Sequence, residues 1–128
     1  MNPFFGNIEE KTLKNSYFRQ VLFTGTHSQL VLMSLKPGEE IGAEVHPYVD
    51  QFFRLEQGEA KFIIDGKEFL AKDANAVIVP AGAKHNVINT SKDKELKLYT
   101  IYSPANHPKG TIHKTLKEAQ EAEEHHHE

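Results

Sequence analysis

Four side chains in the middle of the chain could together bind a metal ion: Glu44, His46, Gln51 and His85. Glu44 and His46 are two positions apart, so on a strand both side chains leave the same face. Gln51 opens the next apolar run and adds an oxygen donor if the chain folds back. His85 follows a rigid Pro-x-Gly turn. Two imidazoles, a carboxylate and an amide oxygen form a donor set that suits Fe, Mn, Co, Ni or Zn as a divalent ion.

The segments that must position these donors are short apolar runs separated by Gly, Pro, Asp and Asn. The expected strands are Val21–Phe23, Gln29–Leu35, Phe52–Glu56, Ala60–Ile64, Lys67–Leu70, Ala76–Val79, Asn86–Ile88 and Lys97–Tyr102. Short strands at spacings of about 8 to 12 residues predict an all-β sandwich or barrel. No helical repeat alternates with them, which argues against a parallel α/β sheet.

Two turns and one helix complete this prediction. Asp65-Gly66 lies between two expected strands and is typical of a type I′ hairpin, whose central residues both need a positive φ. Pro80 cannot donate to a β-ladder, so the strand before it should end there. Helix is expected only at the C-terminal end, where Leu116–Glu124 is rich in good helix formers and Thr115 with Glu118 could make a capping box. This tail carries few apolar residues and is expected on the surface.

Composition limits the classes of protein that the chain can belong to. The 128 residues fit one domain, with a β core at about 20–102 and a helical tail at about 114–124. A net charge of -3 and a pI near 6.2 give no reason to expect nucleic-acid binding. No signal peptide and no apolar stretch near the roughly 18 residues of a membrane span are present. The absence of cysteine excludes disulfides and thiolate sites. We therefore expect a soluble, cytoplasmic protein with no membrane partner.

The combination of these residues resembles the two motifs of the cupin family. The first runs Gly, His-x-His, Glu, Gly, and the second runs Gly, Pro-x-Gly, His, Asn. The positions in register are Gly38, His46, Gly58, Pro80, Gly82, His85 and Asn89. The resemblance covers roughly residues 20 to 102. It implies a double-stranded β-helix, or jelly-roll barrel, that holds one divalent metal ion at the four positions named above.

Three positions depart from the family pattern. Glu44 replaces the first histidine, Gln51 replaces the glutamate, and Ala74 replaces the opening glycine of the second motif. The last change is mild, because a turn is already expected there. The other two preserve one carboxylate in the donor set, which favours a working metal site. Asp50 is a rival to Gln51 as a ligand, but the spacing to Gly58 favours Gln51.

The period of two also predicts what surrounds these donors. Phe53 and Leu55 should share the face of Gln51, and Val87 and Asn89 should share the face of His85. Such a lining is mostly apolar with few polar groups, which is typical of a small-molecule pocket. The alternative is that these four residues are simply the core of the barrel.

The remaining histidines allow two interpretations. His27, His107 and His113 lie in expected loops, where a histidine more often makes hydrogen bonds or faces solvent than binds a metal, although loops often carry function. His125–His127 form a short tail that is either natural or a cloning remnant. It could bind metal adventitiously.

Three functions are compatible with this sequence. The first is a metal-dependent enzyme that acts on a small molecule in the barrel, of the dioxygenase, isomerase or lyase type found among cupins. The alternative is a non-catalytic module that binds a small molecule and uses the metal structurally. A purely structural protein without metal is disfavoured by the preserved carboxylate. The resemblance also implies a homodimer, because small cupins commonly pair through strand edges, which covers free backbone groups.

Overall fold

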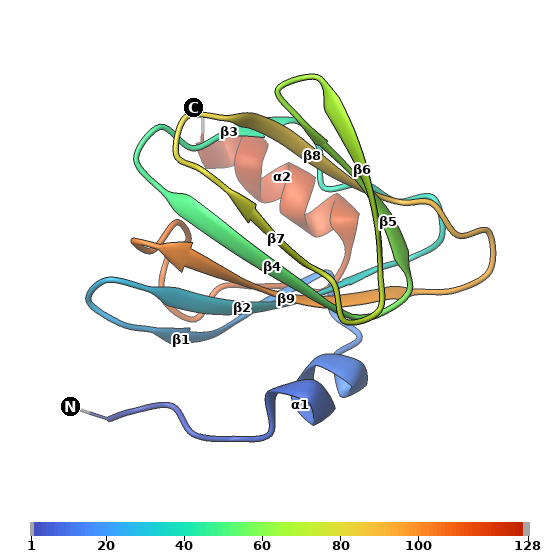
Figure 1. The fold of residues 1–128 in the computed structure, drawn as a ribbon. Coiled ribbons are helices and arrows are strands. Elements are labelled where there is room, and N and C mark those ends of the chain that lie inside the picture. Colours follow the sequence, from blue (N-terminus) through green and yellow to red (C-terminus); the bar gives the residue numbers. More distant parts are fainter. Residues whose placement is uncertain (1, 127–128) are drawn as a thin grey trace.

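The computed structural model describes residues 2–126, and describes side chains as far as residue 124. Two antiparallel β-sheets face each other, with a short helix at each end of the chain (Figure 1). The elements are α1 (Ile8–Lys14), β1 (Arg19–Thr24), β2 (Gln29–Leu35), β3 (Glu44–Val45), β4 (Asp50–Gln57), β5 (Glu59–Ile64), β6 (Lys67–Lys72), β7 (Ala76–Val79), β8 (Lys84–Asn89), β9 (Leu96–Ser103), β10 (Ile112–His113) and α2 (Leu116–His126). The all-β prediction with a C-terminal helix is confirmed.

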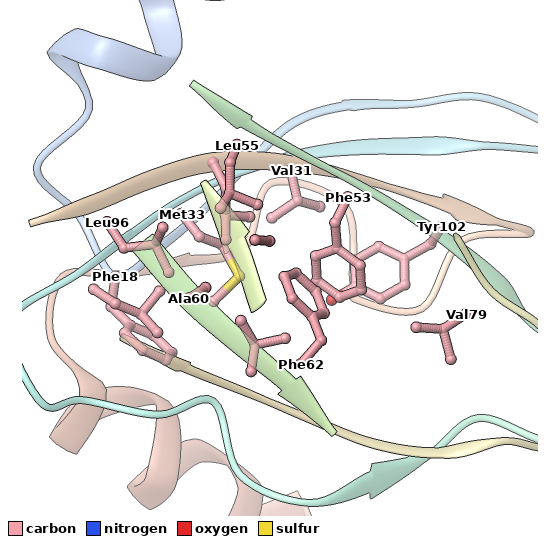
Figure 2. Close-up of a cluster of buried hydrophobic side chains, with 14 of the residues drawn as sticks. Phe18, Val31, Met33, Phe53, Leu55, Ala60, Phe62, Val79, Leu96 and Tyr102 are labelled. Carbon is pink, nitrogen blue, oxygen red and sulfur yellow. The ribbon is translucent and has the colours of Figure 1, made fainter. Parts of the chain in front are cut away.

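Each sheet is built from strands that are distant in the sequence. The six-stranded sheet has the order β10-β1-β2-β9-β4-β7, and the four-stranded sheet has the order β3-β8-β5-β6. Their facing sides bury one continuous apolar core, which includes Val31, Phe53, Leu55 and Phe62 (Figure 2). In β4 buried and partly exposed residues alternate, because successive side chains of a strand point to opposite faces.

The predicted strands agree well with the observed ones. Gln29–Leu35 and Ala76–Val79 coincide with β2 and β7 from end to end, and the other six lie within longer observed strands. The hairpin turn is confirmed as well, because Asp65 and Gly66 have φ angles of 49° and 82°. The strand before Pro80 ends at Val79, as expected.

The expectation that helix occurs only near the C-terminus is wrong. Helix α1 begins after Asn7, whose side-chain oxygen accepts a hydrogen bond from the backbone nitrogen of Glu10 at 3.0 Å. Such an N-cap satisfies one of the free donors at a helix start. Thr12 is the buried residue of this helix, which packs against β2, β4 and β9. Tertiary contact stabilises a helix that is too short to persist alone.

Helix α2 covers the predicted C-terminal segment. Thr115 Oγ1 accepts a hydrogen bond from the backbone nitrogen of Glu118 at 3.1 Å, which is half of the expected capping box. Ala119 is buried in the core and Leu116 packs against it, while most other residues of the helix are exposed. The side chains of His125–His127 lie outside the described residues. Between residues 2 and 126, neither helix has the length and apolar character to cross a membrane.

Candidate metal centre

The two sheets bring the four predicted donors toward the same interior. Glu44 on β3 and His85 on β8 are direct partners in the antiparallel register of the four-stranded sheet. His46 follows β3, and its backbone oxygen accepts a hydrogen bond from the backbone nitrogen of Gly82 at 2.9 Å. Gln51 belongs to β4 of the opposite sheet. The two sequence motifs are therefore joined at the site by backbone pairing.

Glu44, His46 and His85 are neighbours. His46 Nε2 lies 3.0 Å from Glu44 Oε2, and the ring centroids of His46 and His85 are 5.3 Å apart. Although His46 Nε2 is buried and close to the carboxylate, it makes no hydrogen bond of acceptable geometry to any described residue. These three side chains therefore form a cluster of nitrogen and oxygen donors of the kind that divalent metals bind.

The imidazole of His85 is held in the form that binds a metal. His85 Nδ1 lies 3.3 Å from the backbone oxygen of Ala83, which can only accept, so the proton of the neutral ring is on Nδ1. Burial lowers the pKa of His85, and the nearby His46 lowers it further. Because the proton of the neutral ring is fixed on Nδ1, the lone pair of Nε2 is available to bind a metal ion.

A chain of hydrogen bonds fixes the orientation of Gln51. The hydroxyl of Thr100 donates its proton to the backbone oxygen of Phe52 at 2.8 Å, so it can only accept from Gln51 Nε2, at 3.0 Å. The amide oxygen Oε1 is then the free end. It is buried and has no hydrogen-bond partner among the described residues. Because an unpaired buried acceptor is costly, this oxygen fits a position that a cation would occupy.

Asp50 does not share this position. It is exposed at the start of β4, and its Oδ1 accepts a hydrogen bond from the backbone nitrogen of Ala81 at 2.9 Å. Asp50 therefore stabilises the turn Pro80-Ala81-Gly82, which precedes His85. Of the two rivals, the structure places Gln51 inside and Asp50 outside.

Glu44 is ionised and partly open to solvent. Burial alone would raise the pKa of Glu44, but its contact with His46 and the positive charge of Arg19 outweigh that effect and hold it below the ordinary value. The side chains of His46 and Glu44 keep 12% and 25% of their surface exposed. The candidate centre therefore has a negatively charged donor that keeps contact with solvent.

The candidate donors do not amount to a complete metal site. Within the described part of the chain, no three His, Asp or Glu side chains are arranged as a finished metal-binding group. The four positions thus remain a prediction, supported by donor chemistry, by the contact between His46 and Glu44, and by the unpartnered oxygen Gln51 Oε1.

The four residues predicted to line a pocket are all buried. Phe53, Leu55 and Val87 belong to the apolar core, and the ring of Phe53 lies 6.3 Å from that of His85. Asn89 Nδ2 donates to the backbone oxygens of Leu35 and Lys94, both at 3.0 Å. Asn89 therefore ties together segments of the core, and this set agrees with the alternative interpretation as barrel interior.

The sequence prediction missed residues beside the candidate donors. The ring of Tyr102 is 6.0 Å from that of His46, and its hydroxyl lies 3.2 Å from His107 Nε2. Burial raises the pKa of Tyr102 to about 12. Arg19 is also buried, with its Nη1 lying 3.2 Å from His113 Nδ1. The sequence offered one signal for Arg19. It lies two positions before Val21, so on a strand both side chains point to the same, buried face.

Of the three histidines expected in loops, His107 and the partly buried His113, which belongs to β10, border this interior, and His27 does not. His107 is fixed by Gln29, which donates to its backbone oxygen at 2.8 Å and accepts from its backbone nitrogen at 3.0 Å. Burial and the charge of Arg19 lower the pKa of His107 to about 3. The same two causes lower the pKa of His113. His27 is exposed. Both interior histidines are therefore neutral at physiological pH.

Comparison with known proteins identifies relatives along most of the chain. The chain is 49% identical to the uncharacterized protein YrkC of Bacillus subtilis (strain 168), across 95% of this chain and 68% of that protein. It is 49% identical to the uncharacterized protein L612 of Acanthamoeba polyphaga mimivirus, across 83% of this chain and 68% of that one. The chain thus spans about two thirds of the length of these relatives.

A solved structure and a family model agree with this relationship. The crystal structure of BH2720 from Bacillus halodurans superimposes with a TM-score of 0.91 and 43% identity, covering 94% of this chain and 95% of that chain. Residues 31–102 match the family model of the cupin domain. These residues contain β3 through β8, most of β2 and β9, and all four candidate donors. The chain belongs to the cupin family.

Proposed function

We propose that this protein binds one divalent metal ion through Glu44, His46, Gln51 and His85 and uses it as an enzyme acting on a small molecule. The observation that carries the proposal is the buried oxygen Gln51 Oε1, which has no hydrogen-bond partner among the described residues. It accompanies the neighbouring side chains of Glu44, His46 and His85. Leaving a buried polar atom without a partner costs about 1–3 kcal/mol, and an ion bound to Gln51 Oε1 would remove this cost.

Each side chain contributes a different property to the proposed site. His85 supplies a neutral nitrogen whose orientation is fixed by Ala83. Glu44 supplies the negative charge, and Gln51 supplies a neutral oxygen whose direction is fixed by Thr100. If the amide of Gln51 binds weakly, the remaining set of two histidines and one carboxylate leaves positions open for a substrate.

The metal would supply Lewis-acid or redox chemistry of the dioxygenase, isomerase or lyase type. The chain itself orients the substrate and excludes water. Tyr102 keeps a proton on its hydroxyl at neutral pH, since its pKa lies at about 12. Its hydroxyl already lies 3.2 Å from His107 Nε2, so Tyr102 would orient the residues around His46. The substrate is expected to be a small molecule, as for the dioxygenase, isomerase and lyase types found among cupins.

Metal content tests the site. The full-length chain with His125, His126 and His127 replaced by alanine is purified and its metal measured by mass spectrometry. We expect near-stoichiometric metal, and a loss of most of it in His46→Ala and His85→Ala. His27→Ala is the matched control, because this exposed histidine lies outside the site. Full metal retention in both site variants would overturn the assignment.

Turnover separates an enzyme from a binding module. Metal-loaded protein is screened against small-molecule substrates with and without dioxygen. Conversion that is lost in His46→Ala supports the enzyme. Stoichiometric metal and ligand binding without conversion across the screen would instead support the non-catalytic module.

We also propose that the protein works in the cytoplasm as a homodimer. The lack of cysteine suits a reducing compartment. Strands β6 and β7 are edges of the two sheets, and they carry exposed Phe69, Leu70 and Ile78. A surface hollow of about 330 Å³ lies among these residues. A second copy that covers this apolar edge would also pair the free backbone groups.

A further inference from the structure

Arg19 is a buried cation whose hydrogen-bond contacts, His113 and the Tyr102 hydroxyl, carry no negative charge. Its side chain is on the inner face of β1, in phase with buried Val21, and the residue is 7% exposed. Nη1 lies 3.2 Å from His113 Nδ1, and the guanidinium carbon lies 5.3 Å from the ring centroid of Phe18. Nε is buried and has no hydrogen-bond partner among the described residues. None of the ion pairs found among them includes Arg19.

The neighbours of Arg19 cannot neutralise its charge. An arginine only donates and stays protonated in proteins, so His113 must accept through Nδ1 as a neutral ring. His107 is neutral because burial, and after it the charge of Arg19, lowers its pKa to about 3. A buried charge without a counter-ion is strongly unfavourable. Glu44 is the carboxylate whose ionisation Arg19 favours, and the proposed metal would claim that carboxylate.

Arg19 and the candidate donors belong to one interior space. The charge of Arg19 acts on Glu44, on the Tyr102 hydroxyl and on His107. The ring of Tyr102 is in turn 6.0 Å from that of His46, and Tyr102 is the register partner of Gln51. The guanidinium therefore shares the surroundings of Tyr102, whose ring lies next to the candidate donor His46.

We propose that Arg19 is the residue that recognises the ligand of this site, and that the ligand carries a carboxylate. This inference rests on the proposed metal function. Nη1 is directed at His113, and Nε is buried with no hydrogen-bond partner among the described residues. A guanidinium edge that includes Nε matches a planar carboxylate through two parallel hydrogen bonds. A single guanidinium with no second arginine beside it (the other arginine of the chain, Arg54, is next to Glu56 on β4) favours a carboxylate over a phosphate.

The competing role is purely structural. Arg19 and His113 are also register partners between β1 and β10, so the guanidinium could serve only to hold the β10 edge in place. In that structural role, replacing His113 would disturb the protein as much as replacing Arg19. Ligand recognition would depend on the guanidinium and much less on His113. Variants of the two residues therefore separate the two roles.

The test measures the binding of defined anions to the metal-loaded chain, with the three tail histidines replaced by alanine as above. The protein is loaded with Co(II), whose visible spectrum reports changes at the site. It is titrated with acetate and oxalate, with their neutral amides acetamide and oxamide, and with inorganic phosphate. The variants are Arg19→Gln, Arg19→Lys and His113→Gln, with Arg54→Gln as the matched control. Metal content and thermal unfolding are recorded for each.

We expect carboxylates to change the spectrum and the amides to leave it unchanged. Arg19→Gln should weaken carboxylate binding about tenfold or more, since a hydrogen-bonded charged group is lost. Arg19→Lys should weaken it less, and His113→Gln and Arg54→Gln should stay within about twofold of the parent. In all variants the metal content should match the parent.

Three results would overturn the proposal. The first is unchanged carboxylate affinity in Arg19→Gln, and the second is equal loss in Arg19→Gln and His113→Gln, which would show a structural role. The third is phosphate binding tighter than oxalate. Failure of the metal site itself is distinguishable, because the parent protein would then take up no Co(II) in the absence of any anion.

Discussion

Thr100 determines which end of the Gln51 amide faces the interior. Its hydroxyl donates to the backbone oxygen of Phe52 at 2.8 Å, and it accepts from Gln51 Nε2 at 3.0 Å. The free amide oxygen is thus a consequence of a residue on the neighbouring strand β9. A threonine that binds no ligand should for this reason influence metal affinity.

Replacing Thr100 with valine should weaken metal binding several-fold and lower the free energy of unfolding by about 1–2 kcal/mol, because two hydrogen bonds are lost. Metal titration and urea unfolding measure the two effects. Thr12→Val is the matched control, since Thr12 is also fully buried and its hydroxyl bonds a backbone oxygen, but it lies on α1. Equal metal affinity in Thr100→Val and Thr12→Val would contradict the role of Thr100.

The position of the carboxylate in the donor set can be exchanged. Glu44→His combined with Gln51→Glu restores the family arrangement and keeps one negative charge, so it should bind metal about as well as the parent. Glu44→Gln alone removes that charge and should weaken binding at least about tenfold, consistent with the loss of a charged partner. Competition with a metal-sensitive dye measures both. Strong binding by Glu44→Gln would show that the carboxylate is dispensable.

Ala74 should be a point of removable backbone strain. Its φ of 71° lies in the left-handed region, where a side chain costs about 1–2 kcal/mol and glycine costs little. Having alanine in place of the family's glycine therefore costs more stability than we expected from a position in a turn. Ala74→Gly should raise the free energy of unfolding by about 1 kcal/mol in denaturant titrations. Ala76→Gly, within β7, should lower it instead, and stabilisation by both changes would point to another cause.

His107 should make the metal-free protein sensitive to acid. Its pKa lies at about 3 in the folded chain, below its ordinary value of 6.5, so between these values the unfolded chain binds a proton that the folded chain does not. Stability is therefore lost as pH falls from about 6.5 toward 3, with a slope of up to about 1.4 kcal/mol per pH unit for one proton.

His107→Gln should flatten this slope, whereas His27→Gln, at an exposed position, should leave it unchanged. Urea unfolding between pH 7 and pH 4 in the presence of a chelator measures both variants. A slope that His107→Gln does not alter would show that other buried groups cause the acid sensitivity.

A charge on the apolar edge should disrupt the proposed dimer. Leu70 is 82% exposed on β6. Burying this side chain against a second copy would contribute about 1.5–3 kcal/mol to the stability of the dimer. Leu70→Glu should shift the protein to monomer in light scattering after size exclusion. Leu13→Glu is the control, at an exposed leucine on α1 away from this edge. A parent protein that is already monomeric at micromolar concentration would refute the dimer.

The strands and their buried faces could be predicted because a period of two and turn residues such as Asp65-Gly66 act locally. Helix α1 was missed although Asn7 and Glu10 form its cap, because seven residues of mixed polarity give a weak pattern. Strands β3 and β10 have two residues each. They exist only through their partners, which a single segment of sequence does not reveal.

The same distinction applies to the candidate site. Glu44, His46 and His85 could be expected together, because their motifs place them at strand ends. Arg19 and His107 could not, because their positions depend on how β1 pairs and on how Gln29 holds a loop. Register between distant strands is a property of the whole fold. The residues that surround the donors are therefore the part that the structure adds.

The donors are divided between the two sheets. Gln51 projects from β4, while Glu44 and His85 are paired on β3 and β8 opposite it. An ion bound by these side chains would cross-link the two sheets, whose strands share no hydrogen-bonded ladder. Loading the protein would then slow the opening of the whole β-sandwich, and amide exchange deep in both sheets would slow with it.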